Sequence, residues 1–234
     1  MSQWILRGLK TGIKSTAYPA RTDASRGVSP GFPVTTRRAG VEARALAARC
    51  PTAALRDIGD RVEVDYRRCV HCYRCIWGTE TPMNWEQDFE RSTLKPGGAV
   101  LAAAFERSVH ILVVDAGDCG ACLNEVRQLN NPYYNMHRLG FFITPTPRQA
   151  DVLLVVGPVT DHMRLPLQKA YDAMPGPKCV MAVGACALSG GVFGPSFVAG
   201  AGAADVLPVD IEVPGNPPPP LAILHGLLVA TGRN

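Results

Sequence analysis

The sequence predicts an α/β fold in two unequal parts, a flavodoxin-like parallel-sheet domain preceded by a small cysteine-rich domain. Continuous apolar runs, which are typical of strands buried on both faces, indicate the sheet. They span residues 110–117, 151–159 and 179–186. Helix-like stretches at 121–129 and 164–174 alternate with these runs, as crossover helices do between parallel strands. A break at Lys95-Pro96-Gly97-Gly98 precedes this pattern and sets the boundary between the two parts near residue 98.

The composition is that of a globular chain. Of the 234 residues, 47% are hydrophobic and 19% are charged, which excludes a wholly disordered or collagen-like protein. The 24 basic and 20 acidic residues leave a net charge of +4, which is too small to indicate a nucleic-acid partner. A final apolar stretch at 219–232 predicts a helix that closes the second domain.

The cysteine content points to metal chemistry. No apolar stretch approaches the roughly 20 residues that span a bilayer, and the N-terminus lacks the pattern of a signal peptide, so we expect a cytoplasmic chain. Disulfides are disfavoured in that reducing compartment. The eight cysteines therefore predict metal or redox sites.

Residues 1–38 predict a docking segment. Apolar residues recur every four positions from Ile5 to Ile13, with lysine and arginine between them, as in a short basic amphipathic helix. Such a helix can lie on a partner or on a membrane surface, or cap its own domain. The irregular stretch that follows is rich in proline, glycine and serine.

Four cysteines in the segment 39–98 have the spacing of iron-sulfur ligands. Cys69, Cys72 and Cys75 form a C-x2-C-x2-C motif, and Cys50 is followed by proline. Three thiolates two residues apart can bind three corners of a 4Fe-4S cube, and a more distant cysteine supplies the fourth ligand. The spacing therefore predicts one 4Fe-4S cluster held by these four cysteines.

This segment is expected to hold a single cluster. In two-cluster ferredoxins the second ligand set would occupy four further positions, which here are Gly40, Ala43, Leu46 and Thr79. None of these side chains binds iron, so we predict a ferredoxin-like one-cluster domain. The alternatives are a zinc site, which usually uses paired C-x2-C motifs, and free thiols.

The second domain, residues 99–234, contains a further group of cysteines. Cys119 and Cys122 follow the first strand, and Cys186 follows the strand at 179–183, so all three should meet at the carboxyl edge of the sheet. The loop 213–220 comes from the same edge but brings Asn216 instead of a thiolate. Cys179 begins the strand that precedes Cys186, nearly 20 Å away by strand geometry, and is predicted to be a buried free thiol.

These motifs resemble a known family, the small subunit of membrane-bound, energy-converting (group 4) nickel-iron hydrogenases, which is homologous to the cluster-bearing small subunit of respiratory complex I. The resemblance rests on DAGDCGAC, PRQADVLLVVGPVT, PKCVMAVGACALSGGVFG and VPGNPPPPLAILHGLL, which cover about residues 108–232. The N-terminal WILRGLKTGIKSTAYP and the RCP and RCVHCYRC motifs resemble the ferredoxin-type subunit of formate hydrogenlyase-like complexes. The chain thus resembles a fusion of two electron-transfer subunits.

The resemblance implies a second, proximal cluster. Cys119, Cys122 and Cys186 match three of its ligands, and Asn216 stands where relatives have the fourth cysteine. This substitution leaves open a cluster with an altered fourth position, a three-iron cluster or no cluster. Glu125 and Arg148 match residues that tune the cluster or relay protons in the family, although a helix-terminal charge and a surface arginine are equal alternatives.

The leading hypothesis is an electron-transfer subunit that does not itself transform a substrate. It would relay electrons to a hydrogenase-like or complex I-like large subunit. The resemblance implies further partners, namely other ferredoxin-type and membrane subunits, which would hold the chain at the cytoplasmic face of the inner membrane. The alternatives are a structural adaptor with an empty second site and a free-standing iron-sulfur flavoprotein. No G-x-G-x-x-G or P-loop motif is present, so no flavin is predicted.

Overall fold

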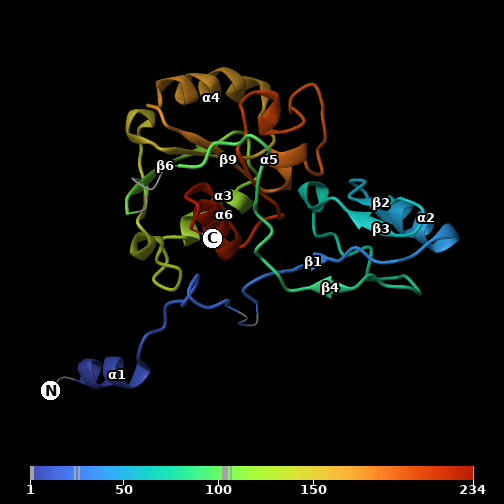
Figure 1. The fold of residues 1–234 in the computed structure, drawn as a ribbon, viewed down its shortest axis with the longest axis horizontal. Coiled ribbons are helices and arrows are strands. Elements are labelled where there is room, and N and C mark those ends of the chain that lie inside the picture. The colour runs from blue at the N-terminus through green and yellow to red at the C-terminus, as the bar shows by residue number, and fades with distance from the viewer. Residues whose placement is uncertain (1–2, 24, 26, 102–104, 106, 234) are drawn as a thin grey trace.

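The computed structural model describes residues 3–23, 25, 27–101, 105 and 107–233. Its centre is a six-stranded sheet in the order β5-β10-β9-β8-β6-β7. Figure 1 labels β6 and β9 of this sheet. The strands are β5 (Thr93–Leu94), β6 (Val109–Asp115), β7 (Phe141–Ile143), β8 (Val152–Val156), β9 (Cys179–Val183) and β10 (Ile211–Val213). All are parallel except the edge strand β5, which runs antiparallel to β10. The predicted flavodoxin-like α/β sheet is confirmed.

Helices cover both faces of this sheet. Along β8, Val152, Leu154 and Val156 pack toward α3 (Ala121–Gln128) and α6 (Pro220–Ala230), whereas Leu153 and Val155 pack toward α4 (Asp161–Ala173). Figure 1 shows α4 on one side of the sheet and α3 with α6 on the other. Every residue of β8 and β9 is therefore buried, which explains why these strands have no alternating polar residues.

The helices predicted for the second domain are present, with one shifted boundary, and the N-terminal helix ends at Thr11, before Ile13. Helix α3 and helix α6 lie within the expected stretches, but α4 begins at Asp161, three residues before the expected start. The three-residue strands β7 and β10 were not predicted, because each is too short to produce an apolar run.

Helix α6 is buried on all sides. All eleven of its residues are buried, because the sheet covers one side and the N-terminal part of the chain covers the other. Tyr18, Phe89 and Leu101 join the same core cluster, and Ser92 Oγ donates a hydrogen bond to the Ala222 carbonyl at 3.0 Å. Gly226 is required here because a Cβ would lie 2.6 Å from Val213 and 3.1 Å from the Met181 sulfur.

The N-terminal part forms small elements with a core of their own. These are α1 (Gln3–Thr11), β1 (Phe32–Pro33), α2 (Gly40–Arg49), β2 (Leu55–Asp57), β3 (Val62–Val64), the 3-10 turn η1 (Tyr66–Arg68) and β4 (Trp85–Glu86). Strand β1 pairs with β4, and β2 pairs with β3, both antiparallel. Ala43 and Leu46, at two of the absent ligand positions, pack against Val62, Val64 and Met83.

Two segments connect differently to the body of the molecule. Helix α1 has no buried residue and projects away from the rest of the chain (Figure 1). Strand β5, which precedes the predicted boundary at residue 98, pairs with β10 in the large sheet. The division into 1–38, 39–98 and 99–234 stays a prediction. No helix among the described residues is both long and apolar enough to cross a membrane.

Asp210 connects the segment after β5 to the large sheet. Its carboxylate accepts hydrogen bonds from the backbone amides of Ala99, at 2.7 Å, and Val180, at 2.8 Å, and its carbonyl accepts one from Lys95 at 2.8 Å. The side chain of one residue therefore connects the segment after β5 to strand β9.

We expect Asp210→Ala to lower the free energy of unfolding by roughly 2–4 kcal/mol, because two hydrogen bonds to a charged group are lost. Urea denaturation followed by circular dichroism measures this change. Asp172→Ala, at an exposed position of α4, is the matched control and should change stability by less than about 0.5 kcal/mol. Equal effects of the two substitutions would contradict the role given to Asp210.

Candidate functional site

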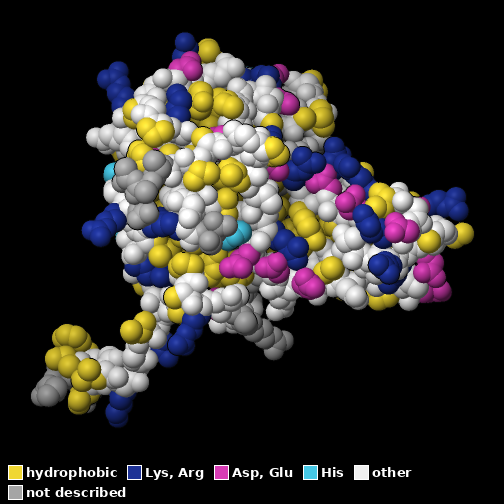
Figure 2. Space-filling model, in the orientation of Figure 1, with side chains coloured by type: hydrophobic (Ala, Val, Ile, Leu, Met, Phe, Trp, Pro, Cys, Tyr) yellow, Lys and Arg dark blue, Asp and Glu magenta, His cyan; other side chains and the backbone are white. Residues whose placement is uncertain are grey.

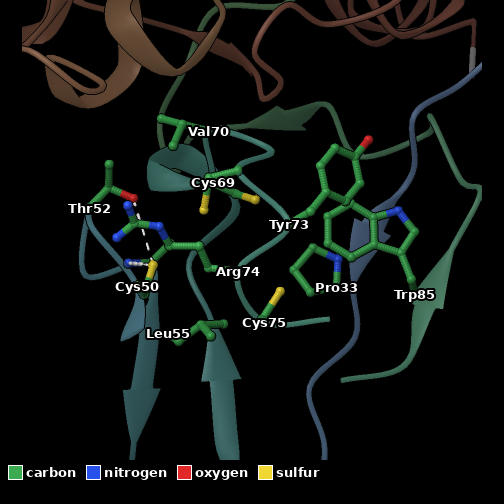
Figure 3. A pocket seen from close by; sticks show the side chains of 12 residues that line it. Pro33, Cys50, Thr52, Leu55, Cys69, Val70, Tyr73, Arg74, Cys75 and Trp85 are labelled. Carbon is green, nitrogen blue, oxygen red and sulfur yellow. Dashed lines mark hydrogen bonds between the residues drawn. The ribbon is translucent and has the colours of Figure 1, made fainter. Parts of the chain in front are cut away.

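Four thiols of the N-terminal part line one pocket. Cys50 follows α2, Cys69 follows η1, and Cys72 and Cys75 lie in the loop after it. Figure 3 shows Cys50, Cys69 and Cys75 around this pocket, with Tyr73, Trp85, Leu55 and Val70 among its walls. The structure thus brings together the four cysteines of the motif, which are 25 residues apart from first to last in the sequence.

The backbone around these thiols supplies hydrogen-bond donors to sulfur. The Ala54 amide donates to Cys50 Sγ at 3.2 Å, and the His71 amide donates to the Cys69 sulfur. Ala53, His71 and Tyr73 have positive φ angles of 51°, 51° and 58°, which fold the chain closely around the pocket. Such N–H to sulfur bonds stabilise thiolates and adjust the potential of a bound cluster.

The electrostatics of the pocket favour a bound cation. Burial, together with the neighbouring thiols, raises the pKa of the Cys69 thiol to about 12 and that of Cys75 to about 11. Several adjacent thiols ionise together only when positive charge compensates them, as iron in a cluster does. The donor set therefore fits an iron-sulfur cluster.

The arrangement differs from that of a single-ion site. Among the described residues, no group of three histidine, cysteine, aspartate or glutamate side chains is placed to hold one metal ion. The thiolates of a 4Fe-4S cluster bind different iron atoms at separate corners, so they surround a pocket instead of meeting at a point.

The charged residues near the motif are largely engaged elsewhere. Arg67 and Arg68 lie 3.1 Å and 3.8 Å from the Asp65 carboxylate, and Arg49 donates to the carbonyls of Arg74 and Trp77. These contacts fix the two ends of the cysteine loop.

His71 contributes no positive charge to the pocket. Its ring lies between Phe32 and Trp85, with ring centroids 4.7 Å and 6.2 Å away. Its Nε2 atom is buried and has no hydrogen-bond partner among the described residues. Burial lowers the pKa of His71 to about 4, so the imidazole is neutral at pH 7.

Three thiols of the second domain also lie together. Cys119 is exposed just before α3, Cys122 is buried in the first turn of α3, and Cys186 is buried in α5 (Ala185–Ser189). They follow the carboxyl ends of β6 and β9, as the topology of the sheet requires. Cys179 lies at the opposite end of β9 and is fully buried, as predicted.

Two glycines make room for these thiols. A Cβ at Gly184 would lie 2.5 Å from Cys122 Sγ, and a Cβ at Gly191 would lie 2.7 Å from Cys186 Sγ. The φ angles of +92° at Gly184 and +58° at Gly191 also favour glycine. The positions of the Cys122 and Cys186 thiols therefore require glycine at 184 and 191, because a larger residue there would displace them.

Burial and neighbouring acidic groups oppose the ionisation of the thiols at the second site. Burial raises the pKa of Cys122, and so do Asp118, Cys186 and Cys119. Burial and Cys119 likewise raise the pKa of Cys186, while a backbone hydrogen bond from Val192 opposes this. This donor set also fits a cationic cluster.

Asp118 was not identified from the sequence. Its Oδ2 atom accepts hydrogen bonds from the amides of Gly120 and Leu123 at 3.0 Å each, which caps the start of α3 beside the thiols. The sequence offered one signal for this role, because Asp118 lies just before a predicted helix and aspartate is common at helix starts.

The other predicted residues have separate positions. Asn216 Nδ2 donates to the Val70 carbonyl at 3.1 Å, so its amide is directed at the cysteine loop of the N-terminal part. Glu125 is half-buried beside Cys122, and burial raises its pKa.

Arg148 is exposed in the 3-10 turn Pro147–Gln149, just before β8 and therefore at the sheet edge opposite the cysteines. The structure does not bring Arg148 to either thiol group.

The structure combines an α/β sheet with three cysteines at its carboxyl edge, and comparison with known proteins identifies the family. Residues 119–230 match the family described as NADH ubiquinone oxidoreductase, 20 Kd subunit. The chain belongs to this family, as the motifs predicted. The match starts at Cys119 and does not include the N-terminal cysteines.

Relatives include subunits of hydrogenase complexes. The probable membrane-bound hydrogenase subunit mbhJ of Pyrococcus furiosus is 40% identical over 141 residues, which cover 60% of this chain and 84% of that protein. Formate hydrogenlyase subunit 7 of Escherichia coli is 38% identical over 134 residues, 57% of this chain, and the match spans only 52% of that protein. An archaeal membrane-bound sulfane sulfur reductase structure aligns with a TM-score of 0.48 at 31% identity, covering 53% of this chain and 68% of that one.

We expect Gly184→Ala to displace the Cys122 thiol and to lower the free energy of unfolding by about 2 kcal/mol, since the added Cβ meets sulfur and the φ angle is strained. Urea denaturation measures the stability, and mass spectrometry after thiol labelling measures the exposure of Cys122. Gly176→Ala is the matched control, because a Cβ there meets nothing within 4 Å and its φ angle is not positive. Unchanged labelling of Cys122 would contradict the expected displacement.

Proposed function

We propose that the chain is a non-catalytic iron-sulfur electron-transfer subunit of an oxidoreductase complex related to hydrogenases and complex I. The convergence of Cys50, Cys69, Cys72 and Cys75 on one pocket is the observation on which this proposal depends. A 4Fe-4S cluster held there accepts and donates single electrons. The family supports membership in such a complex.

The residues around the pocket would influence the reduction potential of a cluster bound there. The pocket walls exclude water from Cys69, and the amides of Ala54 and His71 hydrogen-bond to the sulfurs. Both effects change the balance between the oxidised and reduced states of the site, since burial disfavours negative charge and N–H donors favour it.

Cys119, Cys122 and Cys186 would form the second station of the relay. Burial of two of these thiols and their mutual electrostatic effect support a bound cation there. In this proposal electrons pass between the two sites and then to or from a hydrogenase-like or complex I-like large subunit. Glu125 would tune the second site from its half-buried position, whereas no contact of Arg148 supports such a role.

One observation favours the adaptor alternative. The Asn216 amide is directed at Val70, and in the part of the chain that the structure describes no fourth thiol stands with Cys119, Cys122 and Cys186. In the adaptor, the second site holds no cluster and this domain only binds partner subunits.

Iron content separates the two proposals. In the anaerobically purified chain we expect about seven to eight irons, with about four lost in Cys69→Ser and three to four lost in Cys119→Ser. Iron and acid-labile sulfide assays measure this, with EPR of the reduced protein. Cys179→Ala, a buried cysteine in β9, is the matched control and should retain all iron.

Other results lead to different conclusions. About four irons that are insensitive to Cys119→Ser would overturn the relay and support the adaptor. Iron that is insensitive to Cys69→Ser would overturn the N-terminal cluster.

We propose that the chain is a peripheral subunit at the cytoplasmic face of the membrane, where it assembles with other ferredoxin-type and membrane subunits. In this proposal α1 contributes a contact with lipid. Trp4 and Leu9 in α1, and Ile13 just after it, are 74%, 75% and 90% exposed. The sequence has no acidic residue before Asp23. Figure 2 shows the apolar and basic side chains of this projecting segment together. An exposed apolar face beside only basic charge is complementary to an anionic lipid surface.

We expect the full chain to sediment with vesicles containing phosphatidylglycerol and Leu9→Glu to weaken this binding about tenfold or more, because a charge replaces an inserted apolar group. Leu165→Glu, on the exposed face of α4, is the control and should bind as the unchanged chain does. Equal binding of the two variants would contradict a lipid contact of α1.

A further inference from the structure

The two groups of thiols are connected by a small set of direct contacts between the domains. The turn η1 packs on α5, and Ser189 Oγ donates to the Arg67 carbonyl at 3.0 Å. Asn216 Nδ2 donates to the Val70 carbonyl at 3.1 Å. Arg67 and Val70 lie on either side of Cys69, so both contacts hold the start of the cysteine loop.

The loop that contains Asn216 is itself fixed to the second site. The Gly215 carbonyl accepts a hydrogen bond from Ala185 at 2.7 Å, next to Cys186. The Val213 carbonyl accepts one from Gly184 at 2.9 Å, and Gly184 is the residue that packs on the Cys122 sulfur. The backbone of Asn216 therefore belongs to the second thiol group, and its side chain contacts the first.

The chemistry of the side chain suits this bridge. A carboxamide nitrogen donates hydrogen bonds and reaches the Val70 carbonyl, whereas a carboxylate only accepts and a thiol is a weak donor. Because the bond is partly buried, its loss leaves the Val70 carbonyl without this partner.

We propose that Asn216 is a positioning residue that fixes the Cys69–Cys75 loop against the Cys119, Cys122 and Cys186 group. It acts through Val70 and sets the relative position of the two thiol groups, and it is not an iron ligand. The inference rests on the proposed function in one respect, namely that the cysteine loop holds a cluster. Groups that hold ligands in place in this way determine the geometry and potential of metal sites.

The test compares Asn216→Asp, which has the same shape but no donor, with Asn216→Gln, which keeps the amide. The exposed Asn130→Asp adds the same charge change elsewhere and is the control. In the anaerobically purified full chain we expect Asn216→Asp to accelerate hydrogen exchange in residues 69–75 about fivefold, as the loss of one hydrogen bond implies. Asn216→Gln should restore part of the protection, and the control should change nothing.

Two further measurements distinguish positioning from ligation. Asn216→Asp should lower the reduction potential of the N-terminal cluster in EPR-monitored titrations, because added negative charge disfavours the reduced state. Its iron content should equal that of the unchanged chain. Unaltered exchange and potential in Asn216→Asp would overturn the positioning role, and so would loss of iron from the second site with normal exchange in the loop.

Failure of the proposed function has a different signature. If the unchanged chain holds no iron that depends on Cys69, the N-terminal cluster is wrong. The exchange comparison between Asn216→Asp and Asn216→Gln then still decides whether Asn216 fixes the loop.

Discussion

Buried thiols are the constraint on which both candidate sites depend. A thiol inside the protein resists ionisation, and neighbouring thiols and carboxylates increase that resistance at Cys69 and Cys122. The backbone surrounds these groups closely, with an amide donor at Cys50 and with a glycine where a Cβ would collide with Cys122. Such an arrangement is costly for free thiols and becomes favourable when iron supplies the compensating charge.

The sequence predicted the parts of the fold that have a strong periodic or spacing signal. Strands β8 and β9 form continuous apolar runs because both faces are covered, and this single fact predicts their parallel packing. The four N-terminal cysteines could be grouped from their spacing alone. The strands β7 and β10 could not be predicted, since three residues are too few to show a pattern and their pairing is determined by neighbours.

The roles of individual side chains were harder to predict from the sequence than the fold. A match to a motif suggested that Arg148 tunes a cluster or relays protons, but only the direction of β8 shows that the turn before it lies at the far edge of the sheet. The contact of Asn216 with Val70 joins positions 146 residues apart, so no local pattern encodes it. Asp118 had a local signal, an aspartate at a helix start, yet its effect on Cys122 requires the folded helix.

The residues at the absent ligand positions contribute to the core of the small N-terminal domain. A domain of about 60 residues buries little surface, and a cluster that is lost removes covalent ties between distant segments. Leu46 and Ala43 pack with Val62, Val64 and Met83, so apolar contacts stabilise that side. On its other side, the N-terminal domain contacts α5 through η1 and Asn216 through Val70. The N-terminal thiol pocket therefore lies between a core of its own and the second domain, and its geometry depends on both.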